Sequence, residues 1–382
     1  MARAGLRVLY LIDSLAMGGA ELVLHETCRQ LLRRQVEVRV AVLQTKAGNP
    51  LREAFEALGI AVPDLGITTL RQPSAYWKVR RAVAGAAPDV VHTHLEFANV
   101  LGTLAARRAG VPCVATLHTI ESPAPGSRAW LRFVAQSLVL RRWCTRVIAV
   151  SERARTHYLA VGRLRPQTTI TVYNGVDLRR FDQKPPETQR DVRRELKIPD
   201  AAPVIAVVAV QRPAKGLDRL IAAFPAIRRR HPDAILLLVG DGPERPALET
   251  LAAHLGLSPC VRFAGVRHDV PRLLTAAAVF VLPSLTEALP TALAEAMAAG
   301  VPVIGSAVGG IAEMIQDGVT GILVPPGDVD ALAAAVADLL DQPARVAELV
   351  RAARRLVETR FDAAENVARL HREYLDVCGR RS

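Results

Sequence analysis

The feature that most constrains the fold is an alternation of short aliphatic runs with longer segments of helical character, which continues along most of the chain. The runs in the first half are LRVLYLI, VEVRVAVL, DVVHTH, PCVATLH and RVIAVS, and those in the second half are PVIAVVAV, AILLLVG, VRFAG, AVFVLPS, VPVIGS and GILVP. Runs that are apolar throughout and separated by helices are typical of parallel strands covered on both faces. The pattern therefore predicts an α/β protein with doubly wound, Rossmann-like parallel sheets.

The same rhythm occurs twice, which predicts two domains in a chain of 382 residues. Between the two series, the stretch DLRRFDQKPPETQRDVRRELKIPD is polar, contains prolines and lacks a strand pattern, as a linker does. We therefore place one domain at residues 1–178 and a second at 179–360. Residues 361–382 are expected to form an amphipathic helix that packs back on the first domain. Helices in the first half are expected at 20–34, 98–108, 128–142 and 152–160.

The cysteines and the hydropathy of the chain indicate a cytoplasmic protein. No apolar run approaches the roughly 18 residues that a membrane-spanning helix needs. The N-terminal MARAGLRVLYLIDSL resembles a signal peptide, but its apolar part is short and Asp13 interrupts it, so it is interpreted as the first strand. The cysteines occur singly and without a Cys-x-x-Cys pair, which indicates reduced thiols and neither disulfides nor a zinc site. They are Cys28, Cys113, Cys144, Cys260 and Cys378.

The net charge of +12 is concentrated in the first half of the chain. Residues 1–180 contain 25 Lys/Arg against 12 Asp/Glu, a balance of +13, whereas residues 181–382 contain 24 against 25, a balance of −1. A one-sided basic balance suggests an anionic partner such as nucleic acid, an acidic membrane or a phosphorylated substrate, and an arginine-rich surface without a partner is the alternative. A nucleic-acid binder is disfavoured because the chain has no recognised module and little aromatic interleaving.

One segment of the first half has the composition of a membrane-surface helix. The stretch SRAWLRFVAQSLVLRRWCTR combines five arginines with Trp130, Phe133 and Trp143. A packed helix with arginines at its ends is the alternative. The hypothesis is that the protein associates peripherally with the inner face of the cytoplasmic membrane.

Two features of the first half suggest a ligand site. Gly18 and Gly19 directly follow the first strand, where they allow close approach of a ligand to the backbone and to the free amides of the next helix. The loop is not a Gly-x-Gly-x-x-Gly fingerprint, and the second strand ends without a suitable acidic residue, so a dinucleotide-binding dehydrogenase is disfavoured. His118 ends the strand PCVATLH and should therefore face the ligand-binding edge of the sheet.

In the second half, VQRPAKGLDRL and PSLTEALPTALAEAMAAG each follow a strand. Arg212 and Lys215 lie just before an expected helix near Gly216, and two cations beside a helix N-terminus suit a diphosphate. Glu287 lies in a loop and Glu295 in the interior of a helix, where burying a lone carboxylate is unfavourable. These carboxylates could accept hydrogen bonds from a sugar and a ribose, whereas solvated surface charges are the alternative.

The start of the helix that carries Glu295 can be predicted from its proline. Pro290 suits the first helical turn, so the helix should begin near residues 289–291 and present its free amides to a ligand.

No metal site is expected. His92 and His94 also end a strand, but no further ligand is suitably spaced. Asp328 and Asp330 spell the metal-binding Asp-x-Asp motif of other transferases, but they lie at a helix start, where we expect Asp328 to be the N-cap.

Taken in order along the chain, the motifs resemble those of family 4 of the glycosyltransferases. They are MGGAE, PDVVHTH, TLHT, VIAVSE, YNGVD, KGLDRLI, VGDGPE, AGVRHDV, PSLTEALPTALAEAMAAG, VGGIAEMI and GILVPPGD. The resemblance implies the GT-B fold, with an acceptor domain and a donor domain facing each other across a cleft. It also implies a retaining enzyme that moves a sugar from a nucleotide-sugar, with UDP-sugar the first choice, to a hydroxyl acceptor. That acceptor would be a sugar or a lipid-linked molecule in cell-surface polysaccharide or glycolipid assembly.

The resemblance also implies roles for individual residues. Lys215 and Arg212 would neutralise the diphosphate, Glu287 would hold the donor sugar, and Glu295 would hold the ribose. His118 would line the sugar and acceptor side. The remaining donor-binding positions implied by the family are Gly18, Gly19, Gly265, Val266, Arg267, Leu289, Pro290 and Thr291.

The expected chemistry needs neither metal nor cofactor. Cleavage of the sugar–phosphate bond builds negative charge on the diphosphate, which Lys215, Arg212 and helix amides would stabilise. Two positions depart from the family pattern, since Ala288 replaces the usual Gly and Val210 the usual Arg. The alternatives that remain are an epimerase or hydrolase of the same fold and a non-catalytic nucleotide-sugar-binding protein.

Overall fold

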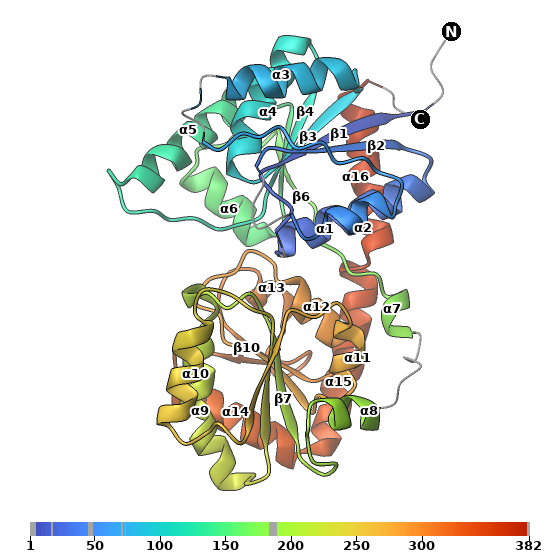
Figure 1. Cartoon of the computed structure of the whole chain (residues 1–382). Coiled ribbons are helices and arrows are strands. Elements are labelled where there is room, and N and C mark those ends of the chain that lie inside the picture. The colour runs from blue at the N-terminus through green and yellow to red at the C-terminus, as the bar shows by residue number, and fades with distance from the viewer. Residues whose placement is uncertain are drawn as a thin grey trace. The chain divides into compact units, whose positions relative to one another are not determined.

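The computed structural model describes residues 5–16, 18–44, 49–69, 72, 74–182 and 189–379 (Figure 1). The chain forms two compact units, one running to Gly175 and resuming at Ala363, the other spanning Val176–Asp362. Each unit contains one six-stranded sheet in which neighbouring strands pair in parallel. The predicted α/β class is therefore confirmed.

The sheet of the first unit has the strand order β2-β1-β3-β4-β5-β6. Its strands are β1 (Arg7–Ile12), β2 (Glu37–Val42), β3 (Val90–His94), β4 (Cys113–Leu117), β5 (Arg146–Ala149) and β6 (Thr169–Thr171). Its helices are α1 (Gly19–Arg33), α2 (Arg52–Glu56), α3 (Ala75–Ala86), α4 (Glu96–Ala109), α5 (Arg128–Trp143), α6 (Glu152–Ala160) and α16 (Ala363–Val377).

Alternate residues of the strands feed two separate hydrophobic clusters, one on each face of this sheet. On β1, Val8 and Tyr10 pack towards α1, α2 and α16, whereas Leu9 and Leu11 pack towards α3, α4 and α5. This is the two-residue period expected of a strand that is buried on both faces. The last helix, α16, packs against α1 and adds Tyr374 to the first cluster.

The second unit has the strand order β12-β11-β10-β7-β8-β9. Its strands are β7 (Val204–Val208), β8 (Ile235–Val239), β9 (Val261–Gly265), β10 (Val279–Leu282), β11 (Val303–Ser306) and β12 (Ile322–Val324). Its helices are α7 (Arg179–Asp182), α8 (Gln189–Glu195), the 3-10 turn η1 (Pro213–Lys215), α9 (Leu217–Arg230), α10 (Arg245–His254), α11 (Val270–Leu274), α12 (Thr291–Ala298), α13 (Ile311–Met314), α14 (Val329–Asp341) and α15 (Pro343–Arg360). The helices α9, α10 and α14 pack together, and α12 packs on α15 (Figure 1).

Two local expectations need correction. The stretch 177–200, interpreted as a linker, contains α7 and α8 and belongs to the second unit. Arg193 ties the stretch to this unit, because its buried guanidinium donates to the carbonyl oxygen of Ala276, before β10, at 3.4 Å, as well as to those of Pro199 and Ala202 at 2.9 and 2.8 Å. In addition, α3 and the short strand β6 were not predicted.

The strand orders define where a ligand can bind in each unit. In the first unit β1 lies between β2 and β3, and in the second β7 lies between β8 and β10. In the first unit the chain adds β2 on one side of β1 and then crosses to add β3 on the other side. In the second unit it adds β8 and β9 on one side of β7 and then crosses to add β10 on the other side. The strand order therefore reverses between β1 and β3 and between β7 and β10. In doubly wound sheets the crevice at the carboxyl ends of such a strand pair is the usual ligand site.

Candidate functional site

In the second unit, the loops that follow β7 and β10 pack backbone against backbone. The amide of Leu285 donates to the carbonyl oxygen of Ala214 at 2.8 Å. Gly216 has a φ of 61°, and a Cβ atom at this position would lie 2.2 Å from the carbonyl oxygen of Pro283. Only glycine fits here, because both the left-handed conformation and the close approach exclude a side chain. The loop that carries Lys215 is thus fixed against the loop that carries Glu287.

Lys215, which follows β7, and Glu287, which follows β10, form an ion pair beyond the carboxyl ends of these two strands. The Lys215 Nζ donates to Glu287 Oε1, and the buried Ser284 donates its hydroxyl to the same oxygen at 3.0 Å. The side chains are 25% and 10% exposed, so the pair is partly shielded from solvent. Sequence reasoning missed Ser284, although its position between β10 and Glu287 was available as a signal. The arrangement places a fixed cation and a hydrogen-bond acceptor side by side, as recognition of a phosphorylated sugar requires.

A third loop, after β11, supports the same segment. The amide of Gly310 donates to the carbonyl oxygen of Glu287 at 3.2 Å. A Cβ atom at Gly310 would lie 1.9 Å from the carbonyl oxygen of Ala288, so glycine is required here by space. The backbone around Ala288, where the sequence departs from the family pattern, is therefore held by direct contact with a neighbouring loop.

Helix α12 begins at Thr291, within the predicted range 289–291, but Pro290 is its N-cap residue and does not lie in the first helical turn. The first amides of a helix have no partner within it, so the amide of Thr291 lies where it can meet an anion. Leu289 precedes the helix, and Pro290 has no amide hydrogen to donate. Glu295 lies one turn further along the helix and is only partly exposed. Burial raises the pKa of its carboxyl group to about 7, and the charge of Arg180 offsets part of that rise.

Arg212 is exposed and caps the N-terminus of η1. In the described ranges it has no ion pair. It is therefore available to a ligand, whereas Lys215 is engaged by Glu287.

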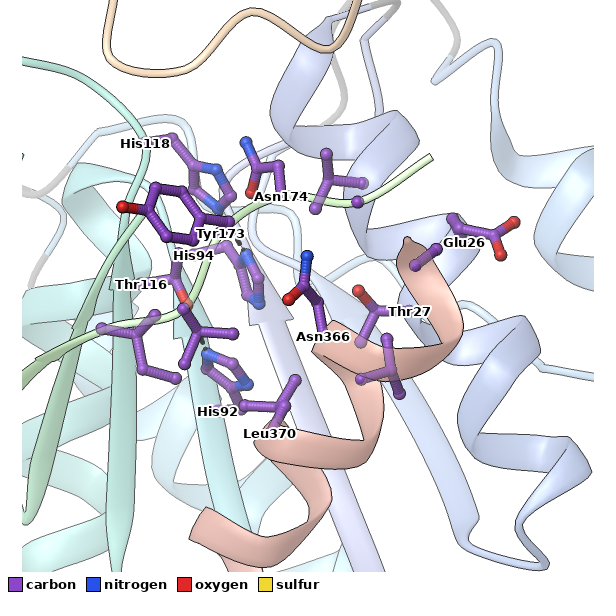
Figure 2. A pocket seen from close by; sticks show the side chains of 16 residues that line it. Glu26, Thr27, His92, His94, Thr116, His118, Tyr173, Asn174, Asn366 and Leu370 are labelled. Atoms are coloured by element: carbon purple, nitrogen blue, oxygen red, sulfur yellow. Dashed lines mark hydrogen bonds between the residues drawn. The ribbon is translucent and has the colours of Figure 1, made fainter. Parts of the chain in front are cut away.

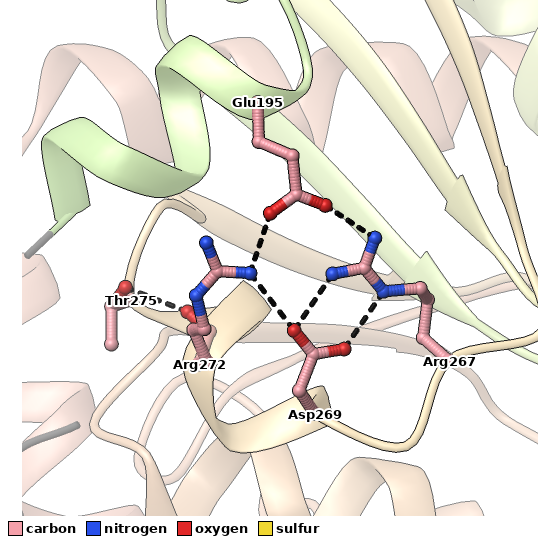
Figure 3. A network of polar contacts seen from close by, with 5 residues as sticks. All are labelled: Glu195, Arg267, Asp269, Arg272 and Thr275. Carbon is pink, nitrogen blue, oxygen red and sulfur yellow. Dashed lines mark hydrogen bonds and ion pairs between the residues drawn. The ribbon is translucent and has the colours of Figure 1, made fainter. Parts of the chain in front are cut away.

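Arg267 does not have a free guanidinium, although the resemblance places it near the nucleotide base. It donates to both oxygens of Asp269 at 2.8 and 2.7 Å and to Glu195 at 2.5 Å (Figure 3). Arg272 donates to the same two acidic residues, to Glu195 at 2.6 Å and to Asp269 at 3.0 Å. The hydrogen bonds from Arg267 lower the pKa of Asp269. This network ties α8 to the segment after β9. Gly265 and Val266 are not part of it, and the side chain of Val266 is exposed.

In the first unit, Gly18 and Gly19 lie at the start of α1. Gly18 is its N-cap residue in an extended conformation, and its carbonyl accepts from the amide of Leu22 at 3.1 Å. A Cβ atom on Gly19 would meet nothing within 4 Å. A Cβ atom on Gly18, in contrast, would lie 2.4 Å from Oε2 of the buried Glu21, so this carboxylate lies against the N-terminus of α1.

His118 belongs to a column of three histidines at the carboxyl ends of β3 and β4 (Figure 2). Nε2 of His118 and Nδ1 of His94 are hydrogen bonded at 2.7 Å, and their rings stack with centroids 5.0 Å apart. The ring of His92 lies 4.4 Å from that of His94 and is hydrogen bonded to Thr116 and, from α16, to Tyr374. Burial lowers the pKa of His118 to about 4 and that of His92 to about 3. All three rings are therefore neutral near pH 7, since burial also lowers the pKa of His94.

The structure thus groups the expected residues by unit. Lys215, Glu287, Glu295 and the start of α12 meet in the second unit, whereas Gly18, Gly19 and His118 belong to the first. Within the ranges given above, no three His, Cys, Asp or Glu side chains are grouped so that they could hold a metal ion. Asp328 accepts from the amide of Ala331 at 2.9 Å, which confirms its predicted role as a helix cap.

The comparison with protein families covers both units. A family described as "Glycosyltransferase Family 4" matches residues 17–180, and one described as "Glycosyl transferases group 1" matches residues 188–356.

Individual proteins show the same similarity. The D-inositol 3-phosphate glycosyltransferase of Salinispora tropica is 31% identical over 375 residues, covering 88% of this chain and 77% of the relative. The 2-deoxystreptamine glucosyltransferase of Streptomyces kanamyceticus is 30% identical, covering 72% and 73% of the two chains. Among solved structures, Anabaena Alr3699/HepE in complex with UDP-glucose superposes with a TM-score of 0.86 at 27% identity, covering 97% of this chain and 99% of the other.

Proposed function

This chain belongs to glycosyltransferase family 4, and on that basis we propose that it transfers a sugar, with retention of anomeric configuration, from a UDP-sugar to a hydroxyl acceptor. The family membership makes it a transferase of the GT-B fold. Retention, the donor and the acceptor are the proposed parts. The proposed donor is supported by the structures of Alr3699/HepE in complex with UDP and with UDP-glucose, which superpose over nearly their full length.

The observation that carries the proposal is the Lys215–Glu287 ion pair at the β7/β10 strand pair. We expect a bound diphosphate to attract Lys215, which would leave Glu287 to accept hydrogen bonds from sugar hydroxyls. Arg212 and the first amides of α12 would add positive potential as the sugar–phosphate bond breaks and its electron pair passes to the diphosphate. The acceptor oxygen would attack from the same face, and its proton would pass to the departing phosphate oxygen. These groups supply the charge stabilisation that a metal ion provides in other transferases, so we propose that no metal is needed.

We propose an anionic or lipid-linked acceptor in the assembly of a cell-surface polysaccharide or glycolipid. The excess of positive charge lies in the first half of the chain, which fits an acceptor with negative charge. The relative from Salinispora tropica is named for inositol 3-phosphate, which is such an anion.

Ligand binding and turnover test the proposed function separately. UDP-sugars should raise the melting temperature of the protein more than GDP- or ADP-sugars do, since a ligand at 100 times its Kd stabilises by about 2.7 kcal/mol. Slow release of UDP from the preferred UDP-sugar, without added metal and in the presence of a chelator, would support a metal-independent transferase. Tight binding with no turnover towards any acceptor would instead indicate a binding protein.

Membrane association is proposed through α5. The N-cap residue of this helix is Ser127, whose hydroxyl accepts from the amide of Trp130 at 3.0 Å. The outer face of the helix exposes Leu131 and Leu138 at 57% and 62%. Val134 is exposed between them, and the arginines on this face are Arg128, Arg132, Arg141 and Arg142. An apolar stripe flanked by arginines complements an anionic membrane surface. Among the helices of the described ranges, none is long and apolar enough to cross a membrane.

Replacing Leu138 with glutamate should lower the partition of the protein onto anionic liposomes about tenfold, because burial of a leucine is worth roughly 1.5–3 kcal/mol. Flotation at physiological salt measures this partition. Leu255→Glu is the matched control, since Leu255 is an exposed leucine of the second unit. If the wild-type protein does not float, or if Leu138→Glu floats as well as Leu255→Glu does, α5 is not the membrane-binding surface.

A further inference from the structure

A small cavity in the first unit lies beside the histidine column. It offers about 40 Å³ between α1, α16, the ends of β3 and β4, and residues 172–175. Its polar lining includes Thr27 from α1, Asn174, and Asn366 from α16 (Figure 2). The space suffices for one or a few water molecules, each of which needs about 10–15 Å³. It is too small for a sugar ring.

One ring nitrogen of a histidine that lines this cavity is buried and lacks a partner in the described part of the chain. His94 is 3% exposed and lines the cavity, and its Nδ1 is hydrogen bonded to His118. Nothing in the described part of the chain forms a hydrogen bond with its Nε2. Buried polar atoms are nearly always satisfied by protein or by ordered water, so an unpaired ring nitrogen at a polar cavity points to bound water.

The two nitrogens of His94 connect the cavity to His118. Both rings are neutral, so the hydrogen bond between His94 Nδ1 and His118 Nε2 contains one proton. If His94 Nδ1 carries it, His94 Nε2 is an acceptor towards the cavity and His118 Nδ1 carries a proton. If His118 Nε2 carries it, His94 Nε2 becomes a donor and His118 Nδ1 a bare acceptor. A proton gained at one outer nitrogen is thus lost at the other.

We propose that ordered water in this cavity binds His94 Nε2 and thereby sets the tautomer of the His94–His118 pair. His94 is then a positioning residue that decides whether His118 offers a donor or an acceptor from its Nδ1. The importance of that choice for transfer rests on the proposed function, in which His118 lines the sugar and acceptor side. The water site and the coupled tautomers do not depend on it.

The first test uses the full-length protein without any ligand. A high-resolution crystal structure should show a water molecule at about 2.7–3.2 Å from His94 Nε2. In protein labelled with 15N-histidine, Asn366→Leu should change the protonation of His94 Nε2 and of His118 Nδ1 in opposite directions, as read from their 15N chemical shifts. Thr27→Val tests the same cavity from the opposite wall in case the first variant does not fold. Arg369→Leu, at an exposed position of α16, is the matched control and should change neither shift.

A dry cavity, or unchanged histidine shifts in both cavity variants, would overturn the proposal. In the active enzyme, Asn366→Leu should lower kcat for transfer about three- to tenfold and leave the donor KM unchanged, because Lys215, Glu287 and Glu295 lie in the second unit and Gly18 and Gly19 are not among the residues that line the cavity. A protein that shows the coupled shifts but transfers no sugar would refute the proposed function and leave the water site standing.

Discussion

Lys215→Ala should lower kcat for sugar transfer by a factor of about 10²–10³, the loss typical when one preorganised group that stabilises a developing negative charge is removed. Lys215 is the cation that the packing of Gly216 against Pro283 fixes in place, so a neighbouring side chain cannot readily replace it. The measurement is UDP release and product formation at saturating donor. The expected loss is larger in kcat than in donor affinity, because the charge on the leaving diphosphate grows in the transition state.

Arg219→Ala is the control for this variant. Arg219 lies one turn further along α9, is half exposed and pairs with its neighbour Asp218. Removing an exposed cation of this kind should change kcat less than twofold and stability by no more than about 1 kcal/mol. A Lys215→Ala enzyme with the kcat of wild type would mean that the diphosphate leaves elsewhere, and the Lys215–Glu287 pair would then be only a structural ion pair.

The effect of Lys215→Ala on folding can be separated from its effect on catalysis by measuring the free energy of unfolding of the variant. Without the lysine, Glu287 keeps the hydrogen bond from Ser284 but loses its counter-charge. In a double-mutant cycle with Glu287→Gln, the free energy of unfolding should therefore show coupling, since the residues are in direct contact.

The sheets could be predicted from the sequence because their strands are continuous aliphatic runs. The start of α12 at Thr291 and the cap of α14 at Asp328 were also predictable, since proline and aspartate affect the backbone only within a few residues of themselves. The strand β6 was missed because it has only three residues, two of them threonine. The helix α3 was missed although Ala75, Val79 and Val83 lie on one buried face at helical spacing.

The histidine column could not be predicted, because its contacts join distant parts of the chain. His92 reaches Tyr374 across 282 positions, and Tyr10 reaches the same hydroxyl across 364. The strand-end expectation was right for His94 and for His118, which directly follows β4, but wrong for His92, which lies in the middle of β3. It also says nothing about which rings touch. For Arg267 the sequence motif predicted a position near the nucleotide base. The structure adds that its positive charge is paired with the carboxylates of Glu195 and Asp269.

Glu295→Gln is expected to have two opposite effects, weaker donor binding and a more stable protein at alkaline pH. The resemblance assigns this carboxylate to the ribose hydroxyls, and a charged acceptor of a hydrogen bond contributes about 1.5–3 kcal/mol, so UDP affinity should fall roughly 10- to 100-fold. The amide keeps the size of the side chain but cannot ionise. Isothermal titration with UDP measures the first effect, and chemical denaturation without nucleotide measures the second.

The sign of the stability effect follows from the pKa of Glu295, which burial raises from 4.5 to about 7 in the folded protein. Between these values the folded protein keeps a proton that the unfolded chain releases, so the free energy of unfolding falls as pH rises from 4.5 to 7. One pKa unit corresponds to 1.36 kcal/mol, so Glu295→Gln should gain about 1–3 kcal/mol over wild type between pH 5 and pH 8.

Comparison with wild type at each pH isolates this contribution. His92 and His118 in the first unit have lowered pKa values, so they cost stability as pH falls below 6.5, but they do so equally in both proteins. Glu348→Gln, at an exposed position of α15, should show no such pH-dependent gain. If Glu295→Gln gains nothing at pH 8 and binds UDP as tightly as wild type, the carboxylate is neither buried in the free protein nor in contact with the nucleotide. That result would remove α12, the helix that carries Glu295, from the proposed mechanism.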